Sequence, residues 1–454
     1  MIFPLIAIGK LIAWFSRFFN IGSGGTWPGE IALFIRPNIF SYFISKVQQR
    51  IILIAGTNGK TTTAKMIKHI IINAGYQEKN IVHNDSGANL LNGLVSAFIQ
   101  KASLFNTPVY DWAVLEVDEA TLPAVISQID SQKVEIIVVL LNLFRDQLDR
   151  YGEVDLIAKK WENAISKLSK NATVILNADD PQVAFLGRGL PCRVAYFGIN
   201  KPERFLQTRE HATDSNYCRN CGVKLKYDGV YFSHIGIWNC PECNNKRPPV
   251  YIKDWISPLP GIYNEYNTLA CVAVGKEINF KNADIQRALA EFAPAFGRQE
   301  EFVLSGKKIK IFLAKNPAGF NATLHTVLDF RPKIILLALN DRIPDGRDVS
   351  WIWDVDFEMI PASTRIIVGG ERAYDMGLRI KYALKSQKSL RFKLRANAKI
   401  KSQNYNSNLK IFDNLKTAIY AGLQNINYGE TLYILPTYSA MLEIRKILGG
   451  RKIL

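Results

Sequence analysis

The sequence predicts an α/β fold in which mostly parallel strands are covered by helices, divided into at least two domains. The first observation is length, because 454 residues are about three times the length of a common single domain. The second is a repeated alternation of an apolar run, a turn and a helical stretch, which begins at Ile51. The third is that this alternation stops near Pro202, where Cys, Tyr, Asn and Gly gather, and starts again after Phe296.

The apolar runs that we expect to form strands fall into two groups. Those of the first group are Ile51–Ala55, Trp112–Val117, Glu135–Leu141 and Thr173–Leu176. Those of the second group are Lys308–Leu313, Lys333–Leu339, Arg365–Val368 and Leu432–Leu435. We therefore expect a central domain over residues 49–296, with a module inserted at about 205–252, and a Rossmann-like α/β C-terminal domain over residues 297–454.

Residues 1–48 form a separate N-terminal segment in this prediction, with an apolar beginning. Residues near helical spacing in it are Leu5, Ile8, Leu11, Ile12, Phe15, Phe18 and Phe19. Lys10 and Arg17 interrupt the run, which argues against a membrane-spanning helix. No small-residue cleavage site follows, which argues against a secretory signal. The pattern predicts an amphipathic helix, and two interpretations stay open: packing on the body of the protein, or docking on the inner leaflet of the plasma membrane.

The charge of the chain favours anionic partners. The 57 basic and 40 acidic residues give a formal net charge of +17, which attracts nucleotides, phospholipid surfaces or pyrophosphate-linked substrates. No helix-turn-helix or RNA-binding signature accompanies the charge, so we do not expect nucleic acid as a partner. With 48% hydrophobic and 21% charged residues, the composition is that of a globular protein and excludes a largely disordered chain.

A phosphate-binding loop is predicted where the first strand ends. Residues 51–63 read IILIAGTNGKTTT, a buried strand that runs into a glycine turn and then into a helix. Gly56 and Gly59 allow backbone N–H groups to point at phosphates, and the N-terminus of the helix adds positive potential. Lys60 reaches the terminal phosphates and the Thr61 hydroxyl can bind Mg²⁺. The residues that we expect to bind ATP here are Gly56, Thr57, Asn58, Gly59, Lys60, Thr61 and Thr62.

Four cysteines of the inserted module have the spacing of a zinc site. They form two CxxC pairs, Cys218 with Cys221 and Cys240 with Cys243, separated by eighteen residues. Four thiolates around one tetrahedral ion leave no open coordination position, so we predict a structural Zn²⁺ that does no chemistry. A pair of disulfides would need an oxidising compartment, whereas an ATP-using protein is expected in the reducing cytosol. The other two cysteines, Cys192 and Cys271, lie in apolar surroundings and are expected to be packing residues.

The loop variant GTNGKT resembles that of the Mur ligase superfamily, which also includes folylpolyglutamate synthase. Further motifs follow in the family's order as far as Glu301. They contribute Glu116 in LEVDE, Asn142 in LNLFRDQLDRYG, Asn177 and Asp179 in NADDP, Gly261, Asn264 and Asn267 in GIYNEYN, and Arg298 in FGRQE. The resemblance implies a Mur-ligase central ATP-binding domain. It further implies that Glu116 binds Mg²⁺ and that the nucleotide side of the site is formed by Asn142, Asn177, Asp179, Asn267 and Arg298.

One motif departs from the family's pattern. Where many Mur ligases have a Mg²⁺-binding histidine in DHxD, residues 146–149 of this chain read DQLD. The amide oxygen of Gln147 is uncharged and binds a hard cation more weakly than the family's site with its histidine does. A counterpart of the family's carbamylated lysine is not evident in this sequence. We therefore expect one firmly bound Mg²⁺, held by Thr61, Glu116 and the phosphates.

Motifs outside the phosphate loop narrow the resemblance to one branch of the superfamily. They are HNDSGAN at 83–89, RDQLDRYGEVD, the cysteine pairs, AKNPAGFN at 314–321 and LNDRIPDGRDVSWIWD at 339–354. The branch consists of ligase-like subunits that amidate the α-carboxyl of D-glutamate in the lipid II stem peptide through an acyl phosphate. The resemblance implies a glutamine-dependent ATP ligase acting as a cytoplasmic heterodimer with a class I, GatD-like glutamine amidotransferase. Lipid II lies at the inner face of the plasma membrane, so a peripheral contact of the N-terminal segment with that membrane stays open.

The histidines give an independent reason to expect a partner. Glutamine hydrolysis needs an activated thiol beside a histidine, and none of the five histidines adjoins a Gly-flanked cysteine in the sequence. By resemblance, Asp348 in DGRD completes the partner's Cys-His pair. The alternative for Asp348 is a local role, as a turn cap or as an ion pair with Arg347. Two other functions also stay open: an amino-acid-adding Mur or folate-type ligase, and a non-catalytic ATP-binding scaffold of a glutaminase.

Overall fold

The structure is a computed structural model of the full chain, and it describes residues 2–19, 25–105, 107–146, 154–293, 298–394 and 408–449. The chain forms two compact units. The first contains the described residues of Met1–Leu206 and Asp214–Ala293. The second contains those of Gln207–Thr213 and Pro294–Lys452. A short part of the inserted module, residues 207–213, therefore belongs to the second unit.

The first unit is built on a six-stranded parallel sheet. In spatial order its strands are β2 (Ile81–His83), β3 (Tyr110–Glu116), β1 (Val47–Ala55), β4 (Glu135–Leu140), β5 (Thr173–Asn177) and β6 (Arg193–Phe197). All neighbouring pairs run parallel, and the central strands are almost completely buried because both faces of such a sheet are covered. The register places Ile54 beside Glu116 and Ala55 beside Leu140, so the ends of β1, β3 and β4 lie together.

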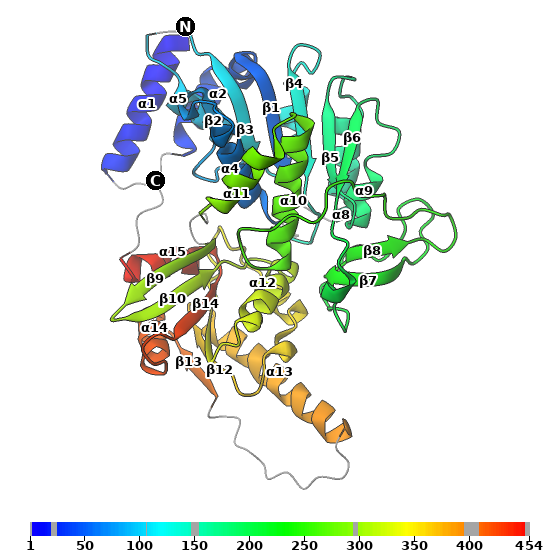
Figure 1. Cartoon of the computed structure of the whole chain (residues 1–454). Helices are drawn as coiled ribbons and strands as arrows, with labels where there is room; N and C mark the ends of the chain where they lie inside the picture. The colour runs from blue at the N-terminus through cyan, green and yellow to red at the C-terminus, as the bar shows by residue number, and fades with distance from the viewer. Residues whose placement is uncertain are drawn as a thin grey trace. The chain divides into compact units, whose positions relative to one another are not determined.

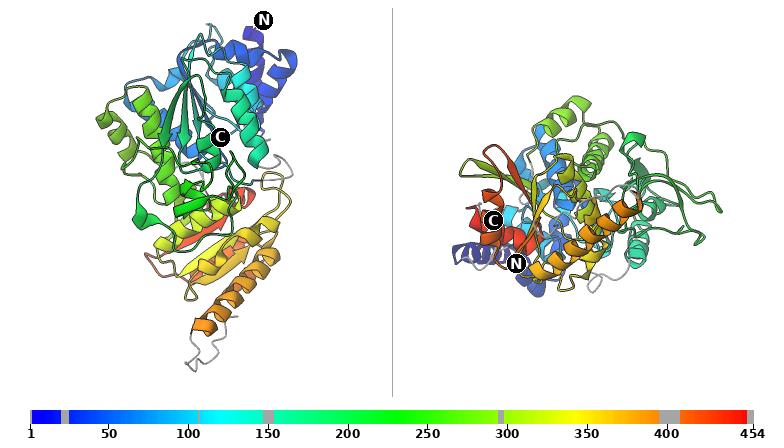
Figure 2. Two further views of the ribbon diagram at one scale, coloured as in Figure 1. Left: turned by 90° about the vertical axis from the view of Figure 1, so that its right-hand side faces the viewer. Right: turned by 90° about the horizontal axis from the view of Figure 1, so that it is seen from below.

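Helices lie on both faces of this sheet (Figure 1 and Figure 2). They include α4 (Lys60–Asn73), α5 (Leu91–Lys101), α6 (Leu122–Ser127), α8 (Val154–Ile165), α9 (Pro181–Phe185), α10 (Ile262–Glu277) and α11 (Asn282–Ala290). Helix α4 follows the glycine turn directly and packs against β3, α10 and α11. This packing fixes the helix whose N-terminus faces the predicted phosphate site.

The N-terminal segment packs on the first unit as three helices. These are α1 (Ile2–Phe18), α2 (Trp27–Ile35) and α3 (Ile39–Ile44), and each contacts α5. Leu5 and Ile6 of α1 join the same buried core as β1. Other apolar residues of α1 face outwards, with Trp14 55% and Phe18 66% exposed. The helix is therefore apolar on its packed side and on part of its free side.

The inserted module is mainly an antiparallel hairpin. Its strands are β7 (Lys226–Phe232) and β8 (Ile235–Asn239), joined by a tight turn at Ser233 and His234. Ser233 adopts a positive φ of 50°, and both turn residues are fully buried. A turn that is buried instead of exposed to solvent must contact other parts of the protein.

The second unit has its own six-stranded sheet. In spatial order its strands are β13 (Leu409–Phe412), β12 (Arg365–Gly369), β11 (Ile334–Ala338), β14 (Thr431–Pro436), β10 (Lys307–Phe312) and β9 (Arg298–Leu304). Only β9 runs antiparallel to its neighbour. The helices of this unit are α12 (Pro317–Asp329), α13 (Ala373–Leu394), α14 (Leu415–Gln424) and α15 (Tyr438–Ile447), with 3₁₀ turns at Ser350–Asp354 and Phe357–Met359. Each apolar run expected to form a strand in this part of the chain overlaps one of these strands.

Candidate functional site

The glycine turn between β1 and α4 has the backbone geometry of a phosphate loop. Gly56 and Gly59 have φ values of 143° and 95°, which side chains other than glycine rarely adopt. A Cβ atom on Gly59 would also lie only 2.2 Å from Oδ1 of Asn267, a residue of α10. The loop therefore needs glycine both for its turn and for the close approach of α10.

Asn142 supports the loop from the end of β4. Its Oδ1 accepts a hydrogen bond from the backbone N–H of Asn58 at 2.8 Å, and its Nδ2 donates to the Asn58 carbonyl at 3.0 Å. The backbone N–H of Thr57 donates to the Asn142 carbonyl at 3.1 Å. Asn142 thus binds the backbone of the loop through its own amide.

Lys60, the first residue of α4, is buried and paired with an acid that the sequence analysis did not select. Its ammonium donates to Oε1 of Glu119 at 2.6 Å and to the Gly56 carbonyl at 2.6 Å. The side chains of Lys60 and Glu119 are 7% and 11% exposed. Glu119 lies three residues beyond Glu116 in LEVDE, shortly after β3, the strand that neighbours β1. This position close to the phosphate loop was the feature of the sequence that could have identified Glu119 as a site residue.

Glu116, at the end of β3, has a carboxylate oxygen that fits a cation. The residue is 4% exposed, and its Oε1 accepts from Asn89 at 3.4 Å. Within the described residues its Oε2 is buried and has no hydrogen-bond partner. A buried carboxylate oxygen is costly unless it is paired, so the donor set suits a hard cation such as Mg²⁺. Thr61, the other predicted ligand, lies half-buried in the first turn of α4.

The NADDP turn is held by its own polar side chains. Asn177 donates to the carbonyl of Leu141 at 3.0 Å and accepts from the Asp179 backbone N–H at 3.0 Å. Asp179 is fully buried, pairs with Arg247 and accepts from the Tyr266 hydroxyl at 2.7 Å. Burial raises the pKa of Asp179, and the Arg247 charge opposes this rise. The predicted nucleotide residues of this turn are therefore engaged in contacts within the first unit.

Asn267 and Asn264 lie on α10 next to α4. The Asn267 amide donates to Oδ1 of Asn264 at 3.2 Å and accepts from the hydroxyl of Thr63 at 3.3 Å. Gly261, with a φ of 97°, caps the start of α10. Asn267 is thereby brought to the glycine turn. Thr62 is buried in the first turn of α4.

Three predicted site residues lie in the second unit or outside the described residues. Gln147 and the rest of DQLD after Asp146 lie outside the described residues. Arg298 begins β9 of the second unit, and its side chain also lies outside the described residues. Asp348 belongs to the second unit and is exposed. Its oxygens accept from the backbone N–H of Ser350 at 2.8 Å and from the Ser350 hydroxyl at 2.9 Å, so it caps a local turn.

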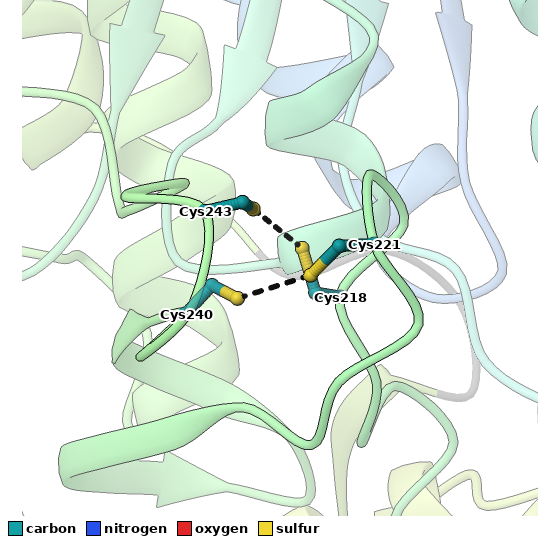
Figure 3. A group of neighbouring side chains, drawn as sticks. All are labelled: Cys218, Cys221, Cys240 and Cys243. Carbon is teal, nitrogen blue, oxygen red and sulfur yellow. Dashed lines mark hydrogen bonds between the residues drawn. The ribbon is translucent and has the colours of Figure 1, made fainter.

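The four cysteines of the inserted module come together as their spacing predicts (Figure 3). Their sulfur atoms all lie within 4.8 Å of one another, with 3.5 Å between Cys218 and Cys243 and 3.4 Å between Cys221 and Cys240. Tetrahedral coordination with Zn–S bonds of about 2.3 Å gives S–S separations of about 3.8 Å, which is close to this arrangement. Cys271 is buried and Cys192 half-buried, and both lie outside the cluster.

The fold and the loop define a class of protein, the Mur ligases. Residues 54–275 match the Mur ligase middle domain family, and residues 313–441 match the MurT ligase C-terminal family. A solved pseudomurein peptide ligase type C from Methanothermus fervidus has the same fold, with a TM-score of 0.61 at 22% identity over 90% of this chain and 80% of that chain. MurF from Acinetobacter baumannii gives a TM-score of 0.56 at 14% identity over 90% of this chain and 78% of that chain.

Curated relatives narrow the class. The lipid II isoglutaminyl synthase (glutamine-hydrolyzing) subunit MurT of Staphylococcus aureus strain COL is 34% identical over 83% of this chain and 87% of its own length. The subunit of the same name from Streptococcus pneumoniae strain ATCC BAA-255 / R6 is 29% identical over 96% of this chain and 94% of its own length. The chain belongs to the MurT family. This confirms the predicted superfamily and the prediction of a ligase subunit.

Proposed function

We propose that this chain is the ATP-using subunit of a lipid II isoglutaminyl synthase. In this reaction ATP phosphorylates the α-carboxylate of D-glutamate in the lipid II stem peptide, and ammonia then displaces phosphate from the acyl phosphate to leave an amide. The observation that carries the proposal is the glycine turn with Lys60 and Glu116 at its edge, in a chain of the MurT family. No amine substrate other than ammonia is needed.

The residues divide the work of ATP binding and phosphoryl transfer. The N–H groups of the glycine turn and the N-terminus of α4 receive the phosphates, and the Lys60 ammonium neutralises charge on the transferring phosphoryl group. Thr61 and Glu116 would hold Mg²⁺, which would supply positive charge against the charge of the phosphates. The asparagines Asn142, Asn177 and Asn267, together with Asp179 and Arg298, remain predicted contributors to the nucleotide side.

The cysteine cluster is proposed to hold one structural Zn²⁺ in a ribbon-like insert. The four sulfur atoms supply a complete tetrahedral set, and the buried apolar cluster beside them contains only Leu225 and Trp238 from the insert apart from the cysteines. With all four positions taken by sulfur, the ion would have no position for substrate. Its role is to hold the insert together.

Ammonia is proposed to come from a class I glutamine amidotransferase subunit, with Asp348 orienting the partner's histidine. Asp348 is exposed and held in a fixed direction by Ser350, which suits a carboxylate that serves another chain. Asp348→Asn should then lower glutamine hydrolysis by the heterodimer about tenfold or more and spare amidation with added ammonium, whereas Asp329→Asn, exposed at the end of α12, should change neither. Equal losses with both nitrogen sources would leave Asp348 with its local turn alone.

The free side of α1 is proposed to dock on an anionic lipid surface. Trp14 and Phe18 stack at 5.2 Å and Phe15 and Phe19 at 5.7 Å, and all four rings are about half or more exposed. Residues 2–29 contain two basic residues and no acid, which complements anionic lipid. No described helix is long and apolar enough to cross a membrane.

Vesicle flotation tests this docking. The chain should float with phosphatidylglycerol vesicles and much less with phosphatidylcholine vesicles, and Trp14→Glu with Phe18→Glu should abolish flotation. Flotation that is unchanged in this variant, or self-association that disappears with it, would instead assign the rings to another contact.

One reconstitution tests the main proposal. The purified chain, its glutaminase and lipid II should consume ATP and replace one hydroxyl of lipid II by an amine, which mass analysis detects. The reaction should disappear with Lys60→Ala. Amide formation with an amino acid and without the glutaminase would indicate an amino-acid-adding ligase. Glutamine hydrolysis without ATP consumption would indicate a scaffold.

A further inference from the structure

A four-residue segment after β4 lies between the phosphate loop and the cysteine insert. We call residues 142–145 the bridging segment. On its first side it holds the loop, because the hydroxyl of Thr57 accepts from the Phe144 N–H at 2.9 Å and donates to the Phe144 carbonyl at 3.2 Å. The Asn142 amide adds its two bonds to the backbone of Asn58. The bridging segment is therefore one wall of the phosphate loop.

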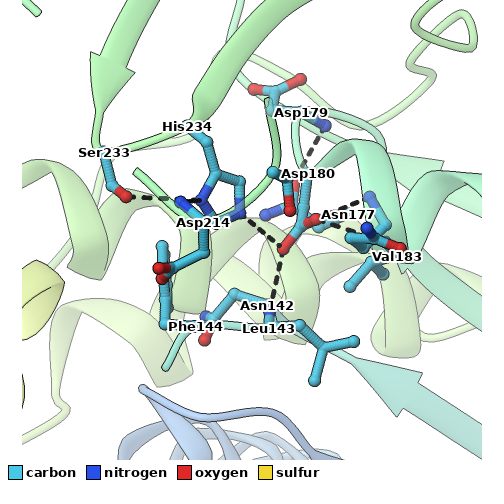
Figure 4. A network of polar contacts seen from close by, with 12 residues as sticks. Asn142, Leu143, Phe144, Asn177, Asp179, Asp180, Val183, Asp214, Ser233 and His234 are labelled. Carbon is cyan, nitrogen blue, oxygen red and sulfur yellow. Dashed lines mark hydrogen bonds and ion pairs between the residues drawn. The ribbon is translucent and has the colours of Figure 1, made fainter. Parts of the chain in front are cut away.

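The second side of the bridging segment is held by the insert (Figure 4). The Phe144 ring packs against His234 at 4.9 Å and against Phe232 at 5.7 Å, measured between ring centroids. Asp214 accepts from the Arg145 backbone N–H at 3.0 Å and forms an ion pair with its guanidinium. In these contacts Phe232 is almost completely buried and His234 is completely buried. This explains why the tip of the hairpin is buried.

Asp180 contacts both the bridging segment and the turn of the insert. It is fully buried, its Oδ1 caps α9, and its Oδ2 accepts from the Leu143 N–H at 2.9 Å. Nε2 of His234 lies 3.5 Å from the same Oδ2 (Figure 4). The backbone N–H of Asp214 donates to the other ring nitrogen of His234, Nδ1, at 3.4 Å. His234 is thereby oriented towards the carboxylate that holds the bridging segment.

The hairpin connects this contact to the cysteine cluster. Strand β8 begins directly after His234 and ends directly before Cys240, so about 20 Å of extended chain joins the tip to a predicted metal ligand. Trp238, the last residue but one of β8, is buried and donates from its indole nitrogen to the Ala178 carbonyl at 3.0 Å. A strand fixed at its base in this way transmits its position to the turn at its tip.

We propose that the cysteine insert is a positioning element for the phosphate loop, acting through His234 and Asp214 on the bridging segment. This inference rests on the proposed use of the loop for ATP, and it gives the insert a role in nucleotide affinity beyond holding itself together. His234 and Asp214 are positioning residues, because their contacts are to Phe144, Arg145 and Asp180 and not to the loop.

The test compares ATP binding by full-length variants. His234→Leu removes the polar ring from the tip, and Asp214→Asn keeps the size of its side chain but loses the charge that holds Arg145. We expect the Kd for ATP to rise about tenfold in His234→Leu and less in Asp214→Asn, with metal content unchanged. His234→Gln, whose terminal amide can approach the position of Nε2, should restore much of the affinity.

Tyr231→Phe is the matched control in the same hairpin. Its hydroxyl donates to the Ile199 carbonyl at 2.8 Å and accepts from the Lys201 N–H at 2.9 Å, on a part of the unit that does not include the bridging segment. It should lower the melting temperature without changing the Kd for ATP. The inference is overturned if folded His234→Leu and Asp214→Asn bind ATP like the wild type, or if Tyr231→Phe weakens ATP binding as much. Failure of the proposed function would look different: wild-type chain that binds ATP but forms no amide.

Discussion

Lys60 Nζ lies 2.6 Å from Oε1 of Glu119, and both side chains are almost completely buried. Removing one partner of such a pair leaves a buried charge without compensation, which costs about 3 kcal/mol or more. We therefore expect Lys60→Ala to lower the free energy of unfolding by about 3 kcal/mol and to weaken ATP binding at least about tenfold, because the loop also loses a charged donor to phosphate. Chemical denaturation and ATP titration measure the two effects.

A double variant separates stability from function at this pair. Lys60→Met with Glu119→Leu removes both charges and keeps apolar volume, so it should recover most of the lost unfolding free energy. ATP binding should stay weak. If ATP affinity returns together with stability, the ammonium is not a phosphate ligand.

Glu116 should show the opposite balance between stability and function. Its Oε2 is buried without a partner among the described residues, so Glu116→Gln removes an unfavourable buried charge. We expect an unfolding free energy equal to that of the wild type or about 1 kcal/mol higher, with a Mg²⁺ requirement for amide formation raised about tenfold. Glu135→Gln, at the other end of the sheet where Glu135 pairs with Arg50 at 2.8 Å, is the matched control and should leave the Mg²⁺ requirement unchanged. An unchanged Mg²⁺ titration in Glu116→Gln would remove it from the cation site.

Metal analysis tests the cysteine cluster. The purified chain should contain one Zn²⁺, and Cys218→Ser or Cys240→Ser should lose most of it. Cys192→Ser and Cys271→Ser, which change cysteines outside the cluster, should retain the full metal content. Strong chelation should weaken ATP binding as His234→Leu does, because both changes act on the bridging segment. A chain that is fully folded without metal would contradict the structural role.

Local patterns in the sequence predicted much of this fold because its elements depend on local chemistry. The run from Ile51 to Thr63 carries its own strand, turn and helix signals, and it forms β1, the glycine turn and α4. The pairing of Lys60 with Glu119 could not be derived in the same way, since it depends on how the segment after β3 folds back towards α4. The sequence pattern also could not predict which apolar residues of α1 are exposed. Leu5 and Ile8 are both large aliphatic residues, but only Leu5 is buried.

The same limit applies to the insert. The CxxC spacing predicted that four thiols would converge, but it contained no sign that the turn at His234 is buried against Phe144. That contact joins residues ninety positions apart, and no periodicity or short motif encodes it. Long-range contacts of this kind decide how the insert relates to the phosphate loop.

Acidification should destabilise the chain through His83, which is fully buried at the end of β2. Its Nδ1 donates to the Val114 carbonyl at 2.7 Å, and burial lowers the pKa of His83 against the opposing charge of Asp85. Because the folded pKa lies below the unfolded value of about 6.5, the unfolded chain takes up the proton first as pH falls, and stability is lost from pH 6.5 down to the folded pKa. Between pH 7.5 and 5.5 this loss should reach up to about 1.4 kcal/mol. His83→Asn, whose amide can still donate to Val114, should remove that part of the pH dependence.

His211→Gln is the control for this prediction. Asp356 raises the pKa of His211, so the stability that His211 contributes is present below pH 6.5 and is lost as pH rises. Removing His211 should therefore make the loss of stability on acidification steeper. Denaturation curves for the three proteins at both pH values decide the matter, and equal slopes in wild type and His83→Asn would exclude the buried imidazole as the cause.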